Sequence, residues 1–247
     1  MAHFTPCIII PCYNHGSTLK LVVKQLQFLQ LPIVIVDDGS DSETKNSIAG
    51  IIEQTPNTYL TTLVKNQGKG AAVMAGIKTA HEHSFTHALQ IDSDGQHSIQ
   101  DAPTLLDIAR TNPKSLISGY PVYDDSVPKL RLYARYLTHV WVWIETLSFT
   151  IKDSMCGFRV YPVSPCISLF KKYKLGTRMD YDIEVLVRFF WDFGDIKFSP
   201  TKVIYPENGV SHFQPFTDNA LISKMHTLLF FGMLLRLPKL LLRKLKR

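Results

Sequence analysis

Two carboxylates stand one residue apart where a short apolar segment ends, in Ala88-Leu-Gln-Ile-Asp-Ser-Asp-Gly-Gln-His97. The apolar segment is typical of a buried strand, and alternate residues of a strand point to the same side, so Asp92 and Asp94 can face one ion. Gln96 supplies a further oxygen. Hard oxygen ligands of this kind suit Mg²⁺ or Mn²⁺, which keep several waters and share their shell with substrate phosphates. Taken alone, the same residues also describe a solvated acidic turn.

A second pair of carboxylates follows an earlier strand. The segment 33–36 is rich in β-branched residues, as in a parallel sheet covered on both faces, and it ends in Asp37 and Asp38. Strands and helices alternate through the first half of the chain, which predicts a doubly wound α/β sheet whose ligands bind beyond the carboxyl ends of the strands. The two acidic strand ends, with Asp92 and Asp94, should therefore share one crevice. Four converging carboxylates repel one another without a cation, so the pattern predicts a binding site.

The elements that must position these residues are visible in the hydrophobic periodicity. We expect strands at residues 7–10, 33–36, 59–63, 88–91 and 116–119, and helices that begin near residues 17, 42, 66 and 101. The segment Asn66-Gln-Gly-Lys-Gly70 lacks the spacing of a P-loop, so ATP hydrolysis is not indicated. Its glycines would let the backbone approach a ligand, and Lys69 could meet a phosphate or a carboxylate. An ordinary helix start is the alternative.

The second half of the chain carries further charged candidates. Arg131 and Arg135 are spaced to lie on one helical face, where they could bind a diphosphate or a lipid phosphate, or simply face solvent. Asp153 precedes a glycine and a strand-like segment. Asp182 and Glu184 stand in the first turn of an expected helix, where acids suit the helix dipole but can also present a base to a crevice. A late strand is expected at 202–205.

Composition and charge narrow the class of protein. The 247 residues are 45% hydrophobic, which is ample for a core, and the four cysteines show no zinc-like spacing, so a reducing compartment is expected. Six of the 27 basic residues lie in 236–247, a segment without an acid. Without those six, the 21 basic residues that remain match 21 acidic ones. This balance argues against a nucleic-acid-binding surface and for an anionic partner at the C-terminus.

The C-terminal segment is the most apolar part of the sequence, yet Arg236, Pro238 and Lys239 interrupt it. Two charges near the middle of a span would oppose insertion by roughly 5–7 kcal/mol. Pro238 suits the first turn of a new helix, with Lys239, Arg243 and Lys246 recurring on one side. We therefore expect amphipathic basic helices lying on an anionic membrane, with docking to a membrane partner as the alternative. The first eleven residues do not predict a signal peptide.

Five motifs in this order resemble the family-2 glycosyltransferases, over about residues 5–238. The resemblance is greatest to dolichyl-phosphate mannosyltransferases and related bacterial polyprenyl-phosphate glycosyltransferases. The motifs are Pro11-Cys-Tyr-Asn14, Val36-Asp-Asp-Gly-Ser40, Asn66-Gln-Gly-Lys-Gly70, Asp92-Ser-Asp-Gly-Gln-His97 and Asp153-Ser-Met-Cys-Gly-Phe-Arg159. The resemblance implies a GT-A fold, which is a Rossmann-like, mainly parallel central sheet flanked by helices. It places the catalytic domain at 1–215 and the helical tail at 216–247.

The resemblance also implies a function. It predicts an inverting transferase that moves a sugar from a UDP- or GDP-linked donor to a membrane-associated acceptor, as in lipid-linked or cell-envelope glycan synthesis. The expected location is the cytoplasmic face of the cytoplasmic membrane. By this carry-over, Pro11, Tyr13 and Asn14 line the base and ribose pocket, and Asp37 and Asp38 contact the nucleoside. Lys69 approaches the nucleotide, and the ribose and metal ligands are Asp92, Asp94 and Gln96.

The acceptor decides what further chemistry is needed. A hydroxyl acceptor requires a general base within about 3 Å. Family members with such acceptors carry an acid near this helix start, so Asp182 is the first candidate and Glu184 the second. A lipid phosphate is already ionised and needs no base, and Arg131 and Arg135, with Asp153 nearby, would then matter more. His212 is a candidate metal ligand or a structural histidine.

Two other functions remain open at this point. The Asp92-x-Asp94 pattern after a strand also occurs in phosphatases of the haloacid-dehalogenase type, although that class leaves the acidic pair at 37–38 and the segment 153–159 unexplained. A catalytically silent scaffold that binds nucleotide-sugars is the other alternative, and turnover distinguishes it from an enzyme.

Overall fold

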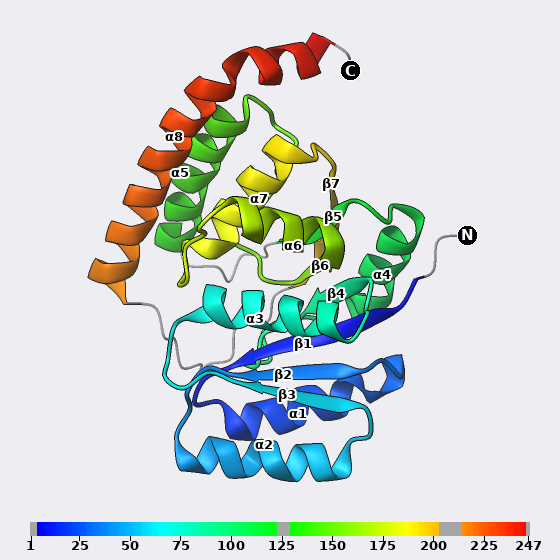
Figure 1. Ribbon diagram of the computed structural model, residues 1–247. Coiled ribbons are helices and arrows are strands. Elements are labelled where there is room, and N and C mark those ends of the chain that lie inside the picture. The colour runs from blue at the N-terminus through cyan, green and yellow to red at the C-terminus, as the bar shows by residue number, and fades with distance from the viewer. Residues whose placement is uncertain (1–3, 123–128, 203–213, 246–247) are drawn as a thin grey trace.

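The computed structural model describes residues 4–122, 129–202 and 214–245, without the side chains of 129–134. Its described strands form one seven-stranded sheet in the order β3-β2-β1-β4-β6-β5-β7. The strands are β1 (Pro6–Cys12), β2 (Ile33–Asp37), β3 (Thr58–Thr62), β4 (His87–Gln90), β5 (Leu116–Pro121), β6 (Arg159–Pro162) and β7 (Ile196–Thr201). The sheet and its flanking helices confirm the expected α/β fold (Figure 1).

One strand breaks the parallel arrangement. Strand β6 pairs antiparallel with both β4 and β5, whereas the pairs β1–β2, β1–β4, β2–β3 and β5–β7 are parallel. In its register Arg159 lies opposite Gln90. The reversed direction brings the amino end of β6 to the edge of the sheet where β4 ends, which is the edge that parallel sheets use for ligands.

Helices cover both faces of the sheet. They are α1 (Gly16–Leu26), α2 (Ser42–Gln54), α3 (Lys69–Glu82), α4 (Ala102–Thr111), α5 (Lys129–Thr146), α6 (Val163–Lys172), α7 (Tyr181–Asp192) and α8 (Pro215–Leu245), with short 3₁₀ turns η1 (Gln27–Leu29) and η2 (Ile99–Asp101). Alternate residues of β1 point into different cores: Ile8 packs with α1, α2 and α4, and Ile9 packs with α3, α6 and α7. This is the two-sided burial expected of a doubly wound sheet.

Helices α5 and α8 lie side by side as an outer layer against α7 (Figure 1). The expected start of a new helix at Pro238 is wrong, because α8 continues through that residue. Proline removes one helical hydrogen bond, and such a residue typically bends a helix without ending it. Figure 1 shows the C-terminal end of α8 turning away from the line of the helix. The division of the chain at residue 215 stays a prediction.

The late strand β7 ends just before the predicted one at 202–205, of which residues 203–205 lie outside the described part of the chain.

A buried histidine predicts how stability depends on pH. The Nε2 of His87 lies 3.2 Å from the carbonyl oxygen of Pro113, its Nδ1 lies 2.9 Å from Oγ1 of Thr86, and burial lowers its pKa. Because the unfolded chain then binds a proton more readily, the free energy of unfolding should fall as the pH drops below about 6.5. In His87→Gln, urea unfolding between about pH 7 and 5 should show a shallower decline. The exposed His81, changed to Gln, serves as the control; equal slopes in all three proteins would contradict the assignment.

Candidate functional site

The predicted acidic strand ends do lie at one edge of the sheet. Strand β1 lies between β2 and β4, so the loops that follow β2 and β4 flank its carboxyl end. Asp38 comes directly after β2, and Asp92 comes two residues after β4. The candidate site is built at this edge from these loops, the start of α3 and the start of α7.

Asp38 is held by the loop that opens α3. Its carboxylate accepts hydrogen bonds from the main-chain NH of Gln67 at 2.7 Å, the NH of Gly68 at 2.8 Å and the side-chain amide of Asn66 at 3.0 Å. Gly68 has φ +100°, a conformation that glycine adopts most easily. Burial raises the pKa of Asp38 despite these donors. The glycine-rich motif and the first acidic strand end therefore form one unit.

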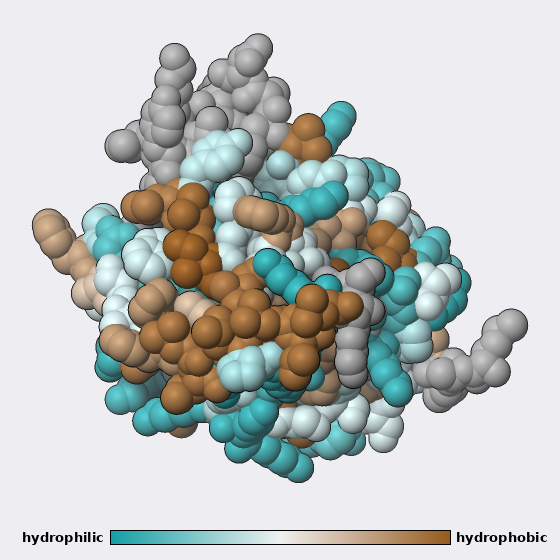
Figure 2. All heavy atoms as spheres, turned by 90° about the horizontal axis from the view of Figure 1, so that it is seen from above, coloured by the Kyte–Doolittle hydropathy of each residue, from teal (hydrophilic) through white to brown (hydrophobic). Residues whose placement is uncertain are grey.

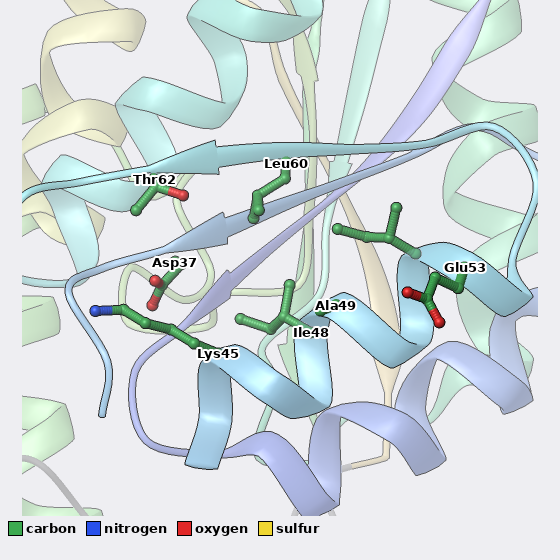
Figure 3. A pocket seen from close by; sticks show the side chains of 8 residues that line it. Asp37, Lys45, Ile48, Ala49, Glu53, Leu60 and Thr62 are labelled. Atoms are coloured by element: carbon green, nitrogen blue, oxygen red, sulfur yellow. The ribbon is translucent and has the colours of Figure 1, made fainter. Parts of the chain in front are cut away.

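Asp37 points in another direction. Its Oδ1 accepts the NH of Ser40 at 2.9 Å and so closes the turn after β2. Its side chain also lines a groove of about 450 Å³ between α2 and the strands β2 and β3, together with Lys45 and Leu60 (Figure 3). Only Asp38 of this pair faces the loop at 66–68.

A largely buried ion-pair network joins three distant segments of the chain. The Nζ of Lys69 lies 2.8 Å from Oδ2 of Asp92 and 3.0 Å from Oδ2 of Asp182. Burial alone would lower the pKa of Lys69, but the two carboxylates raise it well above its ordinary value. Burial alone would raise the pKa of Asp92, but Lys69, assisted by His97 at 3.3 Å, lowers it. Lys69 and Asp92 are therefore charged at neutral pH.

Buried side chains of strands β4 and β6 hold the carboxylate of Asp92 in place. Gln90 donates its side-chain amide to Oδ1 of Asp92 at 2.8 Å and accepts a hydrogen bond from the hydroxyl of Tyr161 at 3.0 Å. Both are buried, and Tyr161 comes from the reversed strand β6. Neither residue belongs to one of the five sequence motifs, because each is an ordinary strand residue until β4 and β6 are paired.

Arg159, the last residue of the motif at 153–159, has a structural role that its sequence context does not predict. It is fully buried and donates to the main-chain oxygens of Asp182 at 2.8 Å and Ser154 at 2.9 Å. It thereby ties the loop before β6 to the start of α7. One of its nitrogens also lies 3.6 Å from Oδ1 of Asp182, a buried oxygen with no hydrogen-bond partner among the described residues.

The two candidate bases differ in their surroundings. Asp182 faces Lys69 inside the network. Glu184 accepts hydrogen bonds from Arg188 at 2.7 Å and from the main-chain NH of Gly176 at 2.7 Å, so it holds the loop before α7 to the helix. Between them, the geometry favours Asp182 as the group that can meet a substrate.

The loop before β6 lies directly over the ion pair. A Cβ added to Gly157 would stand 2.6 Å from Nζ of Lys69 and 2.7 Å from Oδ2 of Asp92. Asp153 shapes this loop by accepting the NH groups of Met155 at 2.9 Å and Cys156 at 2.7 Å. Only a glycine lets the main chain come this close to the charged groups.

Arg135, expected at a phosphate, is bound to Asp153. The guanidinium donates from Nε at 2.5 Å and from a terminal nitrogen at 2.7 Å. Burial alone would raise the pKa of Asp153, but the hydrogen bond from His139 and the charge of Arg135 lower it. The pair links α5 to the loop over the site. The side chain of Arg131 lies outside the described part of the structure.

The remaining candidates lie around this centre. Asp94 is half-buried and accepts the NH of Gln96 at 3.0 Å. Asn14, beyond the end of β1, accepts the NH of Asp41 at 2.9 Å. Pro11 is buried in β1, and Tyr13 is half-buried just after it. Among the described residues, no group of three or more His, Cys, Asp or Glu side chains could hold a metal; His212 lies outside them.

Comparisons with known proteins give the family. The profile of glycosyl transferase family 2 matches residues 7–177. An uncharacterized protein of Methanocaldococcus jannaschii is 31% identical over 159 residues, or 62% of this chain and 69% of that protein. The dolichyl-phosphate beta-glucosyltransferase of Dictyostelium discoideum is 30% identical over 203 residues, or 72% of this chain and 60% of that protein. The chain thus spans about three fifths of that glucosyltransferase's length.

Two solved structures share the fold. Glucosyl-3-phosphoglycerate synthase from Mycobacterium tuberculosis, in complex with Mn²⁺, UDP-glucose and phosphoglyceric acid, has a TM-score of 0.68 at 15% identity, and the match covers 94% of this chain and 80% of that one. TarS from S. aureus in complex with UDP-GlcNAc has a TM-score of 0.60 at 14% identity, over 92% and 66%. At these identities the likeness shows the fold alone, which is GT-A. With the profile spanning most of its length, this chain belongs to glycosyl transferase family 2.

Proposed function

We propose that this protein transfers a sugar, with inversion at the anomeric carbon, from a UDP- or GDP-linked donor to a membrane-associated acceptor. The observation that carries the proposal is the position of Lys69 between Asp92 and Asp182, beside the loop that holds Asp38. This network gathers charged groups at the sheet edge where α/β folds bind ligands. The family assignment supplies the reaction class.

Different residues at this sheet edge bind different parts of the donor in this proposal. Asp38, with Pro11, Tyr13 and Asn14 near the end of β1, binds the nucleoside. Asp92 and Asp94 lie where the ribose and the diphosphate would be bound. Departure of a nucleoside diphosphate places negative charge on its oxygens, and Lys69 offers a partly exposed cation at this point. Preorganised charge of this kind is often the largest part of catalysis.

The carboxylates suit a divalent ion of a particular kind. Mg²⁺ or Mn²⁺ that keeps its waters and binds donor phosphates needs one or two protein carboxylates, which Asp92 and the half-buried Asp94 provide, with Gln96 as a further ligand. When bound, such an ion neutralises charge on the leaving diphosphate. The Mycobacterium neighbour was solved with Mn²⁺, which supports this part of the proposal.

We propose a polyprenyl phosphate as the first acceptor class, because several relatives are dolichyl-phosphate beta-glucosyltransferases. A phosphate oxygen is already ionised and can attack without a base, so Asp182 would then hold Lys69 in place. A glycolipid hydroxyl is the second class. For it, Asp182 is the proton acceptor, because it is the candidate acid that lies beside Lys69 at the sheet edge. In either case the enzyme works on the cytoplasmic face of a membrane.

Calorimetric titration with UDP- and GDP-sugars, with and without Mn²⁺, tests the donor site. Binding of one nucleotide series is expected, and it should weaken when Mn²⁺ is removed. Binding of neither series would contradict the proposal. Turnover of the bound donor in the presence of polyprenyl phosphate separates an enzyme from a silent nucleotide-sugar-binding scaffold.

Asp94→Asn tests the ion-binding role. The change keeps the shape of the side chain but removes its charge, so transfer should fall to near the background rate and the Mn²⁺ dependence of donor binding should weaken. The melting temperature should stay within a few degrees of the wild type, since the side chain is only half-buried. Wild-type turnover in this variant would exclude Asp94 as a ligand.

Gly157→Ala tests the close contact between the loop and the ion pair. The added methyl group would push the flexible end of Lys69 or Asp92 aside, so kcat/KM should fall by about 10²-fold, as for a displacement of about 1 Å. Gly50→Ala in α2 is the matched control, because nothing lies within 4 Å of its added Cβ. The control should keep full activity and gain about 0.5–1 kcal/mol of stability. Equal activity of the two variants would contradict this role of Gly157.

A further inference from the structure

The outward face of the outer layer, α5 and α8, is apolar over much of its length. Figure 2, which views the molecule from above, shows apolar side chains gathered into one broad area. Large exposed side chains on these helices include Leu137, Val140 and Ile144 of α5 and Phe231, Leu235 and Leu242 of α8. Leu235 is 85% exposed and Phe231 is 60% exposed. Apolar areas of this extent on a protein surface mark an interaction site.

No carboxylate is exposed on this layer. The two helices contain only two acids, and both are buried: Glu145 of α5 lies 2.7 Å from Nδ1 of His226, and Asp218 of α8 lies 2.8 Å from Arg178. By contrast, Lys224 and Lys239 of α8 are exposed, and their spacing puts them on the same side of the helix as Leu235 and Leu242. The outward face is therefore apolar and cationic.

Polar contacts hold α8 to the catalytic body along its length. Arg243, expected to face a membrane, instead donates to the main-chain oxygens of Phe190 at 2.5 Å and Trp191 at 3.1 Å, at the C-terminal end of α7. Arg236 stacks over the ring of Trp191 at 4.6 Å. By length and composition α8 is the one described helix that could cross a membrane. Crossing would break these contacts, so the geometry favours a helix that lies flat.

Both helices of the layer are also tied to loops of the candidate site. Arg135 of α5 holds Asp153 in the loop whose Gly157 covers the Lys69–Asp92 pair. Asp218 of α8 holds Arg178, whose neighbour Thr177 presents its carbonyl oxygen beside Gly68. The layer and the site thus share two direct ion-pair links.

We propose that the outward face of α5 and α8 docks on the surface of an anionic lipid bilayer. Apolar side chains enter the headgroup boundary and the exposed lysines face anionic headgroups, as in other interfacial helices. A second copy of the chain is a poorer occupant, because two faces with lysines and without acids repel each other. The inference deepens the proposed function, on which it rests for the lipid-borne acceptor, by naming the surface that brings the site to that acceptor.

Vesicle flotation tests the surface, with vesicles of phosphatidylcholine alone and with added phosphatidylglycerol. The wild type should float with the anionic vesicles and much less with the neutral ones. Leu235→Glu combined with Leu242→Glu should abolish flotation, because both changes place a charge in the docking face. Leu21→Glu combined with Phe28→Glu, at exposed positions of α1 and η1 on the other side of the sheet, is the matched control and should float like the wild type.

The lysines are tested separately. Lys224→Ala and Lys239→Ala should each weaken binding to anionic vesicles about fivefold, and Lys20→Ala and Lys24→Ala in α1 should not. Flotation of the glutamate double variant at the wild-type level, or no flotation of the wild type, would overturn the proposal. So would a wild-type dimer that the double variant converts to monomers, since a second copy would then cover the face.

Nucleotide-sugar calorimetry on the same variants keeps the two proposals apart. The glutamate double variant should bind the donor like the wild type while failing to float. A wild type that floats but binds no nucleotide-sugar would overturn the proposed function and leave the docking surface standing. A wild type that binds the donor but does not float would overturn the docking surface and leave the proposed function standing.

Discussion

The ammonium group of Lys69 lies between Asp92 and Asp182, and much of the structure serves to keep it there. A buried carboxylate without a partner costs several kcal/mol, so two of them at one point need a cation. The three residues come from the end of β4, the start of α3 and the start of α7. Their ion pairs therefore bind together segments that share no local sequence, and they place charge where a diphosphate would leave.

The reversed strand β6 supplies side chains that hold this network in position. Because β6 runs against β4, its first residue, Arg159, lies at the same sheet edge as the carboxyl end of β4. From there Arg159 reaches the main chain of Asp182, and Tyr161 reaches Gln90 beneath Asp92. A parallel strand at this position would bring its other end to this edge. The one exception to the parallel sheet thus carries side chains that hold the charged centre.

Two part-buried ion pairs also connect the outer helices α5 and α8 to the candidate site. Arg135–Asp153 reaches the loop that contains Gly157, and Arg178–Asp218 reaches the segment beside Gly68. Both carboxylates are buried, so loss of either arginine would leave a buried charge without its main partner, and the links therefore constrain where the layer sits. The two acids of these helices, Glu145 and Asp218, are both buried, so the outward surface is apolar and basic.

The sequence by itself determined strands β1 to β5, their alternation with helices, and the edge at which the acidic motifs gather. A strand buried on both faces is a short apolar segment, so its position can be recognised from neighbouring residues alone. It also determined the family, because the five motifs and their order can be recognised without knowledge of any tertiary contact. Only the tertiary structure decided the partners: Arg135 with Asp153, Glu184 with Arg188, and Asp182 with Lys69. It decided too that β6 is reversed and that α8 continues through Pro238, whose flanking residues pack on α7 and the core. Charged residues pair according to their distance in space. For residues far apart in the chain, a local sequence pattern does not predict that distance.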